Sequence, residues 1–258
     1  MPQTTLRLLQ DKGSVAVLNG DAHHNCKQMF MSMMTPERIT AFVDLTIEEW
    51  QLQLQKWAQA EQVNLHDAVR EVLTRAICRW AGIPQLTSRE ALRRTHEFSA
   101  MIEGAGSLGP RNWRGLLMRE FNERWCRDII TSIRSGKLDV PAESAAHIIA
   151  WNRDLNGALL DPKIASVELI NILRPTVAVG RFIVFAALAL HEPPDFRAQL
   201  QNGTDDDLEC FVQEVRRFYP FSHLSVATSS RSSRGMTKPT LPKSGFIISN
   251  VRAAPYQQ

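Results

Sequence analysis

The residues best suited to bind an anion stand in an apolar stretch in the second half of the chain. Arg174 and Pro175 lie in the middle of a helix expected from about Pro162 to His191. A guanidinium group in apolar surroundings needs an anionic partner, because an unpaired buried charge is costly. Pro175 removes the backbone hydrogen bond to the carbonyl of Asn171 and favours a kink. This pair is the first candidate for chemistry.

A second candidate is the pair Glu214 and Arg217. Their i, i+3 spacing puts both side chains on one face of a helix that begins after Thr204. An isolated pair of this kind is usually exposed and contributes about 0–1 kcal/mol. The position of this pair, one short helix after the apolar helix, makes a functional or structural role more plausible than for an isolated pair.

Cysteine, histidine and methionine residues give weaker signals. The four cysteines are far apart and show no CxxC spacing, so neither a zinc site nor a disulfide framework is expected. His23 and His24 fit a surface pair as well as a functional one. Core filling is the better interpretation of a run of four methionines than metal binding. The residues in question are Cys26, Cys78, Cys126 and Cys210, and Met29, Met31, Met33 and Met34.

The elements that position these residues are helices. Pro36 fits the first turn of a helix capped by Thr35, and Asn64 and Ser88 mark two further helix starts. The predicted helices run from Pro36 to about Ala60, with Trp50, Leu54 and Trp57 on one face; from Asn64 to Gly82 and Pro84; from Ser88 to the Gly104–Gly106 run; and from Pro110 to near Gly136. We expect no strand before residue 240 and a short edge strand within Gly245–Val251.

The longest helix should lie at the centre of the fold. Its second half, Val177 to Leu190, is apolar on almost every side, which is typical of a helix buried in a large core. A membrane span needs about 20 apolar residues, and Arg181 interrupts this stretch. The sequence therefore predicts a mainly α fold with a long central helix, little sheet and no membrane span.

Composition excludes several protein classes. The 258 residues are 44% hydrophobic and 22% charged, with 30 basic and 27 acidic side chains, as in ordinary globular proteins. So small a net charge of +3 does not indicate nucleic-acid binding. Met1 to Asp11 lack a signal-peptide core, so we expect a cytoplasmic protein. The Ser/Thr-rich segment 222–240 is expected to be a flexible, solvated linker.

Four strings stand out along the chain. They are Asn19-Gly20-Asp21-Ala22-His23 leading through Lys27 to Met34-Thr35-Pro36; Ile170 to Pro175, continuing to Glu192; Phe211 to Phe221; and Leu241 to Phe246. Together they resemble the fatty-acid peroxygenase (alpha/beta-hydroxylase) branch of the cytochrome P450 superfamily. The Arg-Pro within the long helix is specific to this branch, and Glu-x-x-Arg is common to the superfamily.

The resemblance implies a role for each candidate residue. The central helix would cross the distal face of a haem, where Arg174, beside Pro175, would bind the carboxylate of a long-chain fatty acid. That carboxylate would act as the acid–base group that helps hydrogen peroxide to split, so that no reductase is needed. His23 and Lys27 would face the haem propionates. Glu214 and Arg217 would be structural, with both side chains partnered inside the fold.

The same resemblance predicts an incomplete member of the family. Relatives carry their haem-ligand cysteine well after the Glu-x-x-Arg helix, whereas no cysteine follows Cys210 in this sequence. We therefore expect a partial P450-like helical domain in 1–221, a flexible segment in 222–240, and a remnant of the family's final strand and tail in 241–258. An internal deletion accounts for this arrangement.

Three functions remain open at this point. The first is a haem-thiolate peroxygenase, although this chain should be inactive without the proximal cysteine loop. The second is a non-catalytic remnant, and the third is a helical fatty-acid-binding protein without haem. For Arg174 the plainer alternatives are an ion pair with Glu168 or a surface arginine whose head reaches water.

Overall fold

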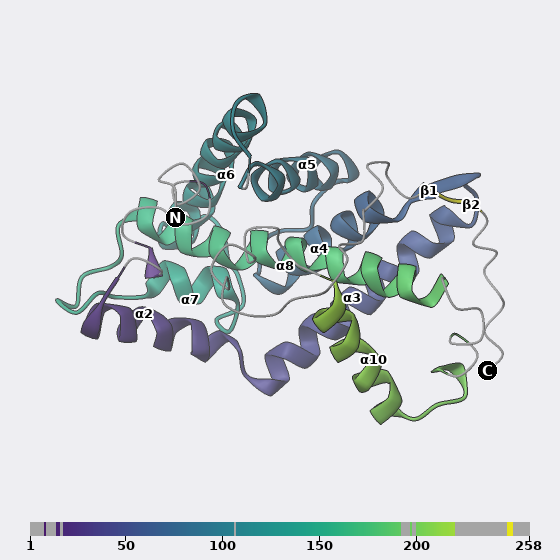
Figure 1. The fold of residues 1–258 in the computed structure, drawn as a ribbon. Helices are drawn as coiled ribbons and strands as arrows, with labels where there is room; N and C mark the ends of the chain where they lie inside the picture. The colour runs from purple at the N-terminus through teal and green to yellow at the C-terminus, as the bar shows by residue number, and fades with distance from the viewer. Residues whose placement is uncertain are drawn as a thin grey trace, which may run out of the picture. The chain divides into compact units, whose positions relative to one another are not determined.

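The computed structural model describes residues 8, 14–15, 18–105, 107–191, 197, 200–219 and 247–249. In these residues the chain forms eight helices and two short strands (Figure 1). In chain order they are α2 (Gly20–Met33), α3 (Pro36–Trp57), β1 (Gln62–Asn64), α4 (Leu65–Trp80), α5 (Ser88–Gly104), α6 (Pro110–Arg134), α7 (Ala145–Trp151), α8 (Pro162–His191), α10 (Asp205–Phe218) and β2 (Ile247–Ser249). The predicted mainly α fold with a long helix and little sheet is confirmed.

The chain divides into two compact units. The first comprises residues 1–59 and 70–178, and the second comprises residues 60–69 and 179–258. Helices α4 and α8 each contribute to both units. The segment 222–240 and the string Leu241–Phe246 lie outside the described residues, so the flexible linker stays a prediction.

Side-chain caps set the helix starts that the sequence indicated. The Thr35 hydroxyl accepts a hydrogen bond from the backbone N–H of Arg38, and Pro36 occupies the first turn of α3. Thr87 and Glu90 form a capping box at the start of α5. The Asn64 side chain accepts from two backbone N–H groups of α4. These helices begin where expected because their caps satisfy N–H groups that the helix itself leaves unpaired.

Two elements were not expected. β1 pairs antiparallel with β2, in the register Val63 opposite Ile248, so the expectation of no strand before residue 240 was wrong. The strand expected near the end of the sequence is present as β2. Helix α7 was also missed; its cap is Ser144, whose hydroxyl accepts from the N–H of His147 at 3.4 Å.

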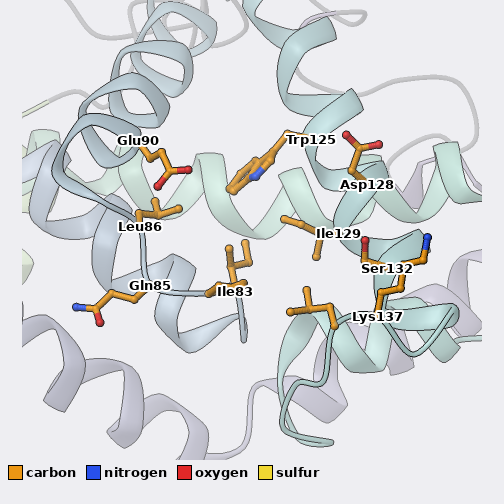
Figure 2. Close-up of a pocket in the computed structure, with 11 residues that line it drawn as sticks. Ile83, Gln85, Leu86, Glu90, Trp125, Asp128, Ile129, Ser132 and Lys137 are labelled. Carbon is orange, nitrogen blue, oxygen red and sulfur yellow. The ribbon is translucent and has the colours of Figure 1, made fainter.

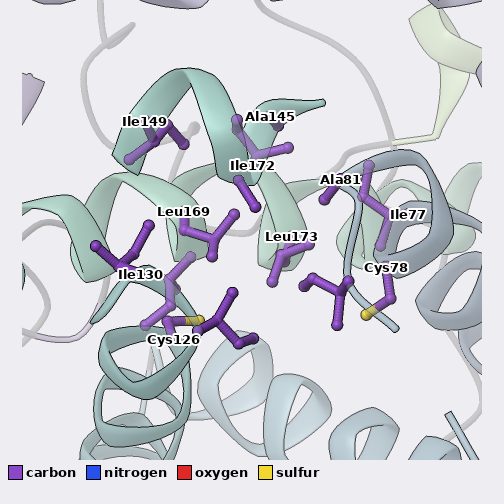
Figure 3. Packing of buried hydrophobic residues seen from close by; sticks show 14 of the residues in the cluster. Ile77, Cys78, Ala81, Cys126, Ile130, Ala145, Ile149, Leu169, Ile172 and Leu173 are labelled. Carbon is purple, nitrogen blue, oxygen red and sulfur yellow. The ribbon is translucent and has the colours of Figure 1, made fainter. Parts of the chain in front are cut away.

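The core of the first unit gathers around the first half of α8. Apolar side chains of α8 pack with side chains of α4, α6 and α7, as Figure 3 shows. Leu169 and Leu173 are fully buried at its centre. The other buried residues of the cluster labelled in Figure 3 are Ile77, Cys78, Ala81, Cys126, Ile130, Ala145, Ile149 and Ile172. The first half of α8 therefore lies at the centre of this core, as the sequence predicted for the helix.

The second half of α8 differs from the prediction. Residues 181–190 are only half-buried, although they are the more uniformly apolar part. The helix continues through Pro175, whose side chain is exposed, and the Thr176 hydroxyl donates to the Ile172 carbonyl at 2.9 Å. By length and hydropathy, α8 is the one helix of the described residues that could cross a membrane, and 28% of its most apolar window is buried. The absence of a membrane span stays a prediction.

Aromatic packing organises the second unit. The rings of Phe185 and Tyr219 stack with centroids 4.7 Å apart and planes 12° apart. Helix α10 begins with a capping box between Thr204 and Asp207, and buries Phe211 and Val215 on one face. The acidic first turn predicted from the sequence is present, and it favours the helix dipole.

Candidate functional site

Arg174 is a buried arginine in the first half of α8. Its side chain and backbone together are 8% exposed, and Nη1 donates to the backbone carbonyl of Leu8 at 3.1 Å. It is therefore not a surface arginine with its head in water. Glu168, the other partner considered, accepts hydrogen bonds from the Val15 N–H at 2.7 Å and the Asn171 amide at 3.0 Å. The guanidinium of Arg174 is thus buried and contacts a neutral carbonyl, and its expected anionic partner stays a prediction.

A second buried arginine meets the same carbonyl. Arg119, on α6, donates from Nη1 to the Leu8 carbonyl at 2.7 Å and from Nε to the Glu123 carboxylate at 2.6 Å. Its Nη2 is buried and has no hydrogen-bond partner. Sequence reasoning missed Arg119; the signal was its i, i+4 spacing from Glu123 within α6. The two guanidinium groups converge on one neutral acceptor.

The electrostatics of this pair favour an anion. Burial lowers the pKa of Arg174 to about 10, and the positive charge of Arg119 adds to the effect. The group therefore remains charged at neutral pH, but its charged form is destabilised. An anion beside the two guanidiniums would offset these effects, because charge-assisted hydrogen bonds to a carboxylate are stronger than those to a neutral carbonyl.

Two glycines make room for Leu8 beside these arginines. The Leu8 side chain is fully buried and packs where α5 and α6 approach each other. A Cβ added at Gly104 would lie 3.1 Å from Leu8 Cδ2, and one at Gly115 would lie 3.3 Å from Leu8 Cδ1 and 3.0 Å from the Ala100 carbonyl oxygen. We call this space, bounded by Gly104 and Gly115, the Leu8 notch.

The other basic candidates lie on α2. His23 and Lys27 are one helical turn apart and so share a face; His23 is half-buried and Lys27 is exposed. The rings of His23 and His24 have centroids 6.0 Å apart. The predicted role of His23 and Lys27 in facing haem propionates stays a prediction. In the described ranges, no group of three or more metal-ligating side chains comes together.

Comparisons with known proteins identify the relatives of this chain. No family model matches the sequence. Among solved structures, cytochrome P450SP alpha (CYP152B1) in complex with (R)-ibuprofen is 43% identical, with a TM-score of 0.81 over 85% of this chain and 54% of that one. Cytochrome P450EX alpha (CYP152N1) with myristic acid is 40% identical, with a TM-score of 0.78 over 85% and 52%. Over 85% of its length the chain is similar to solved CYP152 cytochromes P450.

A structure with lower sequence identity has a similar fold. A variant of cytochrome P450 OleT in complex with arachidonic acid is 28% identical, with a TM-score of 0.80 over 85% of this chain and 52% of that chain. The resemblance to the fatty-acid peroxygenase branch, predicted from the sequence, is confirmed. The chain spans about half the length of the relatives it matches.

CYP152 proteins are cytochromes P450, which hold haem iron with a cysteine thiolate. The described cysteines do not fit that role. Cys26, Cys78 and Cys126 are buried, and burial raises the pKa of Cys26 and of Cys78 to about 12 and also raises that of Cys126. These thiols remain protonated at neutral pH. Cys210 is exposed, but it lies within α10 rather than on a loop.

The Glu-x-x-Arg pair corrects one prediction. Glu214 and Arg217 bind each other, with Arg217 Nε donating to Glu214 Oε2 at 2.8 Å, as their spacing indicated. The side chains are 59% and 70% exposed, respectively, so the expectation that they lie inside the fold was wrong. The physical reason is helix phase: α10 buries Phe211 and Val215, and Arg217 lies on the opposite side.

A surface hollow of the first unit lies elsewhere (Figure 2). Its volume is about 410 Å³, and it is open to solvent. Residues of the α4–α5 connection and of α6 line it, among them Ile83, Leu86, Trp125 and Ile129, with the charged groups of Asp128 and Lys137 at its edge. Arg174 is not among the lining residues, so this hollow carries none of the chemistry predicted from the sequence.

Proposed function

We propose that this chain carries the carboxylate-binding part of a peroxide-dependent fatty-acid hydroxylase, an oxidoreductase of the monooxygenase type. The observation that supports the proposal most strongly is the buried guanidinium of Arg174, in the helix where the branch has its Arg-Pro pair. The ligands of the related structures are (R)-ibuprofen, myristic acid and arachidonic acid, and all three are carboxylic acids. A carboxylate is the anion that a guanidinium fork matches best.

In this proposal Arg174 binds the carboxylate of a long-chain fatty acid and fixes the position of its alkyl chain. Pro175, whose side chain is exposed, is proposed as a substrate-binding residue beside Arg174. A carboxylate held in this way can accept and return a proton during cleavage of hydrogen peroxide. The oxidant is hydrogen peroxide, so the whole protein needs no reductase. The proposed location is the cytoplasm.

The residues described do not supply the thiolate that the haem of this branch requires. We therefore assign substrate binding, and no redox step, to this chain. His23 and Lys27 are proposed to face haem propionates. By itself the chain is not expected to hydroxylate fatty acids.

Two measurements test this proposal. The first is binding of myristate to the full chain, below the critical micelle concentration, with Arg174→Lys as the variant. We expect at least a tenfold loss of affinity, because lysine cannot present the planar fork. Arg134→Lys is the matched control, since Arg134 is another partly buried arginine that donates to backbone carbonyls, those of Ala150 and Leu160. Equal affinity in the Arg174 variant and the unaltered chain would reject the proposal.

The second measurement separates binding from catalysis. The chain is produced with haem supplied, and the ferrous–CO spectrum and peroxide-driven hydroxylation of myristate are recorded. We expect neither a thiolate-type band nor hydroxylated product. Product that forms and disappears in Arg174→Ala would show that the chain is itself an active enzyme. Binding of myristate without haem uptake would instead leave a fatty-acid-binding protein.

A further inference from the structure

The Leu8 carbonyl already fills the acceptor position between the two buried arginines. It accepts from Arg174 Nη1 at 3.1 Å and from Arg119 Nη1 at 2.7 Å. One neutral oxygen therefore serves two cations from two different helices, α6 and α8. Arg119 Nη2 remains without a hydrogen bond although it is buried, and such orphaned buried donors are uncommon in folded proteins.

We propose that Arg119 is a second carboxylate-binding residue, and that the Leu8 carbonyl holds the place of the substrate carboxylate in the ligand-free chain. This inference rests on the proposed function, since it takes the ligand of Arg174 to be a carboxylate. A carboxylate brings two oxygens in place of one. It can therefore accept from Arg174 and also from the unpaired Nη2 of Arg119, which the carbonyl leaves unsatisfied.

The contacts of Arg119 suit this role. Its Nε is fixed by Glu123 at 2.6 Å, and both side chains are about 95% buried, so the fork is held in one orientation before any ligand arrives. Nη1 donates to the Leu8 carbonyl at 2.7 Å, and the buried Nη2 has no hydrogen-bond partner. Preorganisation of this kind lowers the entropy cost of binding.

Leu8 is held by its side chain as well as by its carbonyl. The Leu8 notch encloses the side chain between two glycines, at contact distances of 3.1 and 3.3 Å for an added Cβ. The carbonyl must leave the arginines when a carboxylate binds. The more tightly the notch holds the Leu8 side chain, the more tightly a carboxylate must bind in order to displace the Leu8 carbonyl.

The first test is Arg119→Lys in the full chain, with myristate and tetradecanol as probes. Lysine keeps a positive charge beside Glu123 but cannot supply Nη2. A hydrogen bond to a charged group contributes about 1.5–3 kcal/mol, so myristate affinity should fall about 10- to 100-fold. Tetradecanol affinity should not change, because the alcohol has no carboxylate. Arg134→Lys is again the control and should leave both affinities unchanged.

The second test is Leu8→Ala, which loosens the notch contact and leaves both arginines intact. We expect myristate to bind several-fold more tightly than to the unaltered chain. Equal or weaker binding would contradict the displacement of Leu8. If circular dichroism shows that Arg119→Lys does not fold, the result with Leu8→Ala tests the inference by itself.

The outcomes separate this inference from the proposed function. If Arg174→Lys has no effect on myristate binding, the proposed function fails and the inference fails with it. If Arg174→Lys weakens binding and Arg119→Lys does not, only the role of Arg119 is rejected. If the unaltered chain does not bind but Leu8→Ala does, and Arg119→Lys abolishes that binding, the inference is supported.

Discussion

Replacing Leu173 by alanine should test whether the first half of α8 carries the core. The side chain is fully buried among apolar residues of α4, α6 and α7 (Figure 3). Leucine-to-alanine changes at such sites cost about 2–5 kcal/mol, because the lost transfer energy is joined by a cavity term. Leu173 lies in a densely packed cluster that cannot easily collapse, so we expect about 3 kcal/mol.

Leu92→Ala is the matched control for this change. Leu92 also lies inside a helix, α5, but it is 47% exposed. The helix-propensity change is therefore the same in both variants, and burial is the difference. Leu92 buries about half of its side chain, and full burial of a leucine contributes roughly 1.5–3 kcal/mol, so Leu92→Ala should lower the free energy of unfolding by about 1 kcal/mol.

Urea unfolding followed by far-UV circular dichroism measures both variants. The midpoint of Leu173→Ala should fall well below that of Leu92→Ala, with a similar m-value. A difference between the two free energies of unfolding below about 0.5 kcal/mol would refute the reasoning, since it would place Leu173 outside the stabilising core.

Three further predictions concern single groups. Burial raises the pKa of Glu168 above its ordinary value of 4.5, so the folded chain binds this proton more tightly than the unfolded chain does. The stability gained in this way is complete below pH 4.5 and is lost as the pH rises through the folded-state pKa. Glu168→Gln should remove that decline from a series of urea unfolding midpoints. Cys210, which is exposed, should react with a thiol reagent within minutes, whereas the three buried cysteines should react only after unfolding; rapid labelling of four thiols would contradict this. Glu214→Ala should leave the unfolding midpoint unchanged, because its ion pair with Arg217 is exposed, and a clear drop would mean that the pair has buried partners.

Local signals allowed most helices to be predicted from the sequence. Thr35 with Pro36 and Asn64 marked helix starts correctly because capping depends on a few adjacent residues. Helix α7 escaped notice because seven residues contain too little periodicity to distinguish it from a loop. β1 escaped notice for a related reason: three residues show no alternation, and the strand exists only because β2 pairs with it.

The environment of the candidate site depended on long-range packing and could not be read in the same way. Arg174 was found because a charge in an apolar helix is conspicuous in a single segment. Arg119 was not, because its importance comes from a carbonyl that lies 111 positions away in the chain. The exposure of Glu214 and Arg217 followed from which face α10 buries, and the sequence of that helix shows the pair without showing its surroundings.

The pairing of β1 with β2 has a consequence for the order of events during synthesis. The backbone hydrogen bonds of each described helix join residues of one segment, but Asn64 finds its partner Ile247 only after about 180 further residues have been made. At typical elongation rates of about 5–20 residues per second, β1 waits roughly 10–35 seconds with its backbone edge unpaired. During this interval residues 62–64 lack the partner that makes them a strand, so this pairing should be among the last described contacts to form.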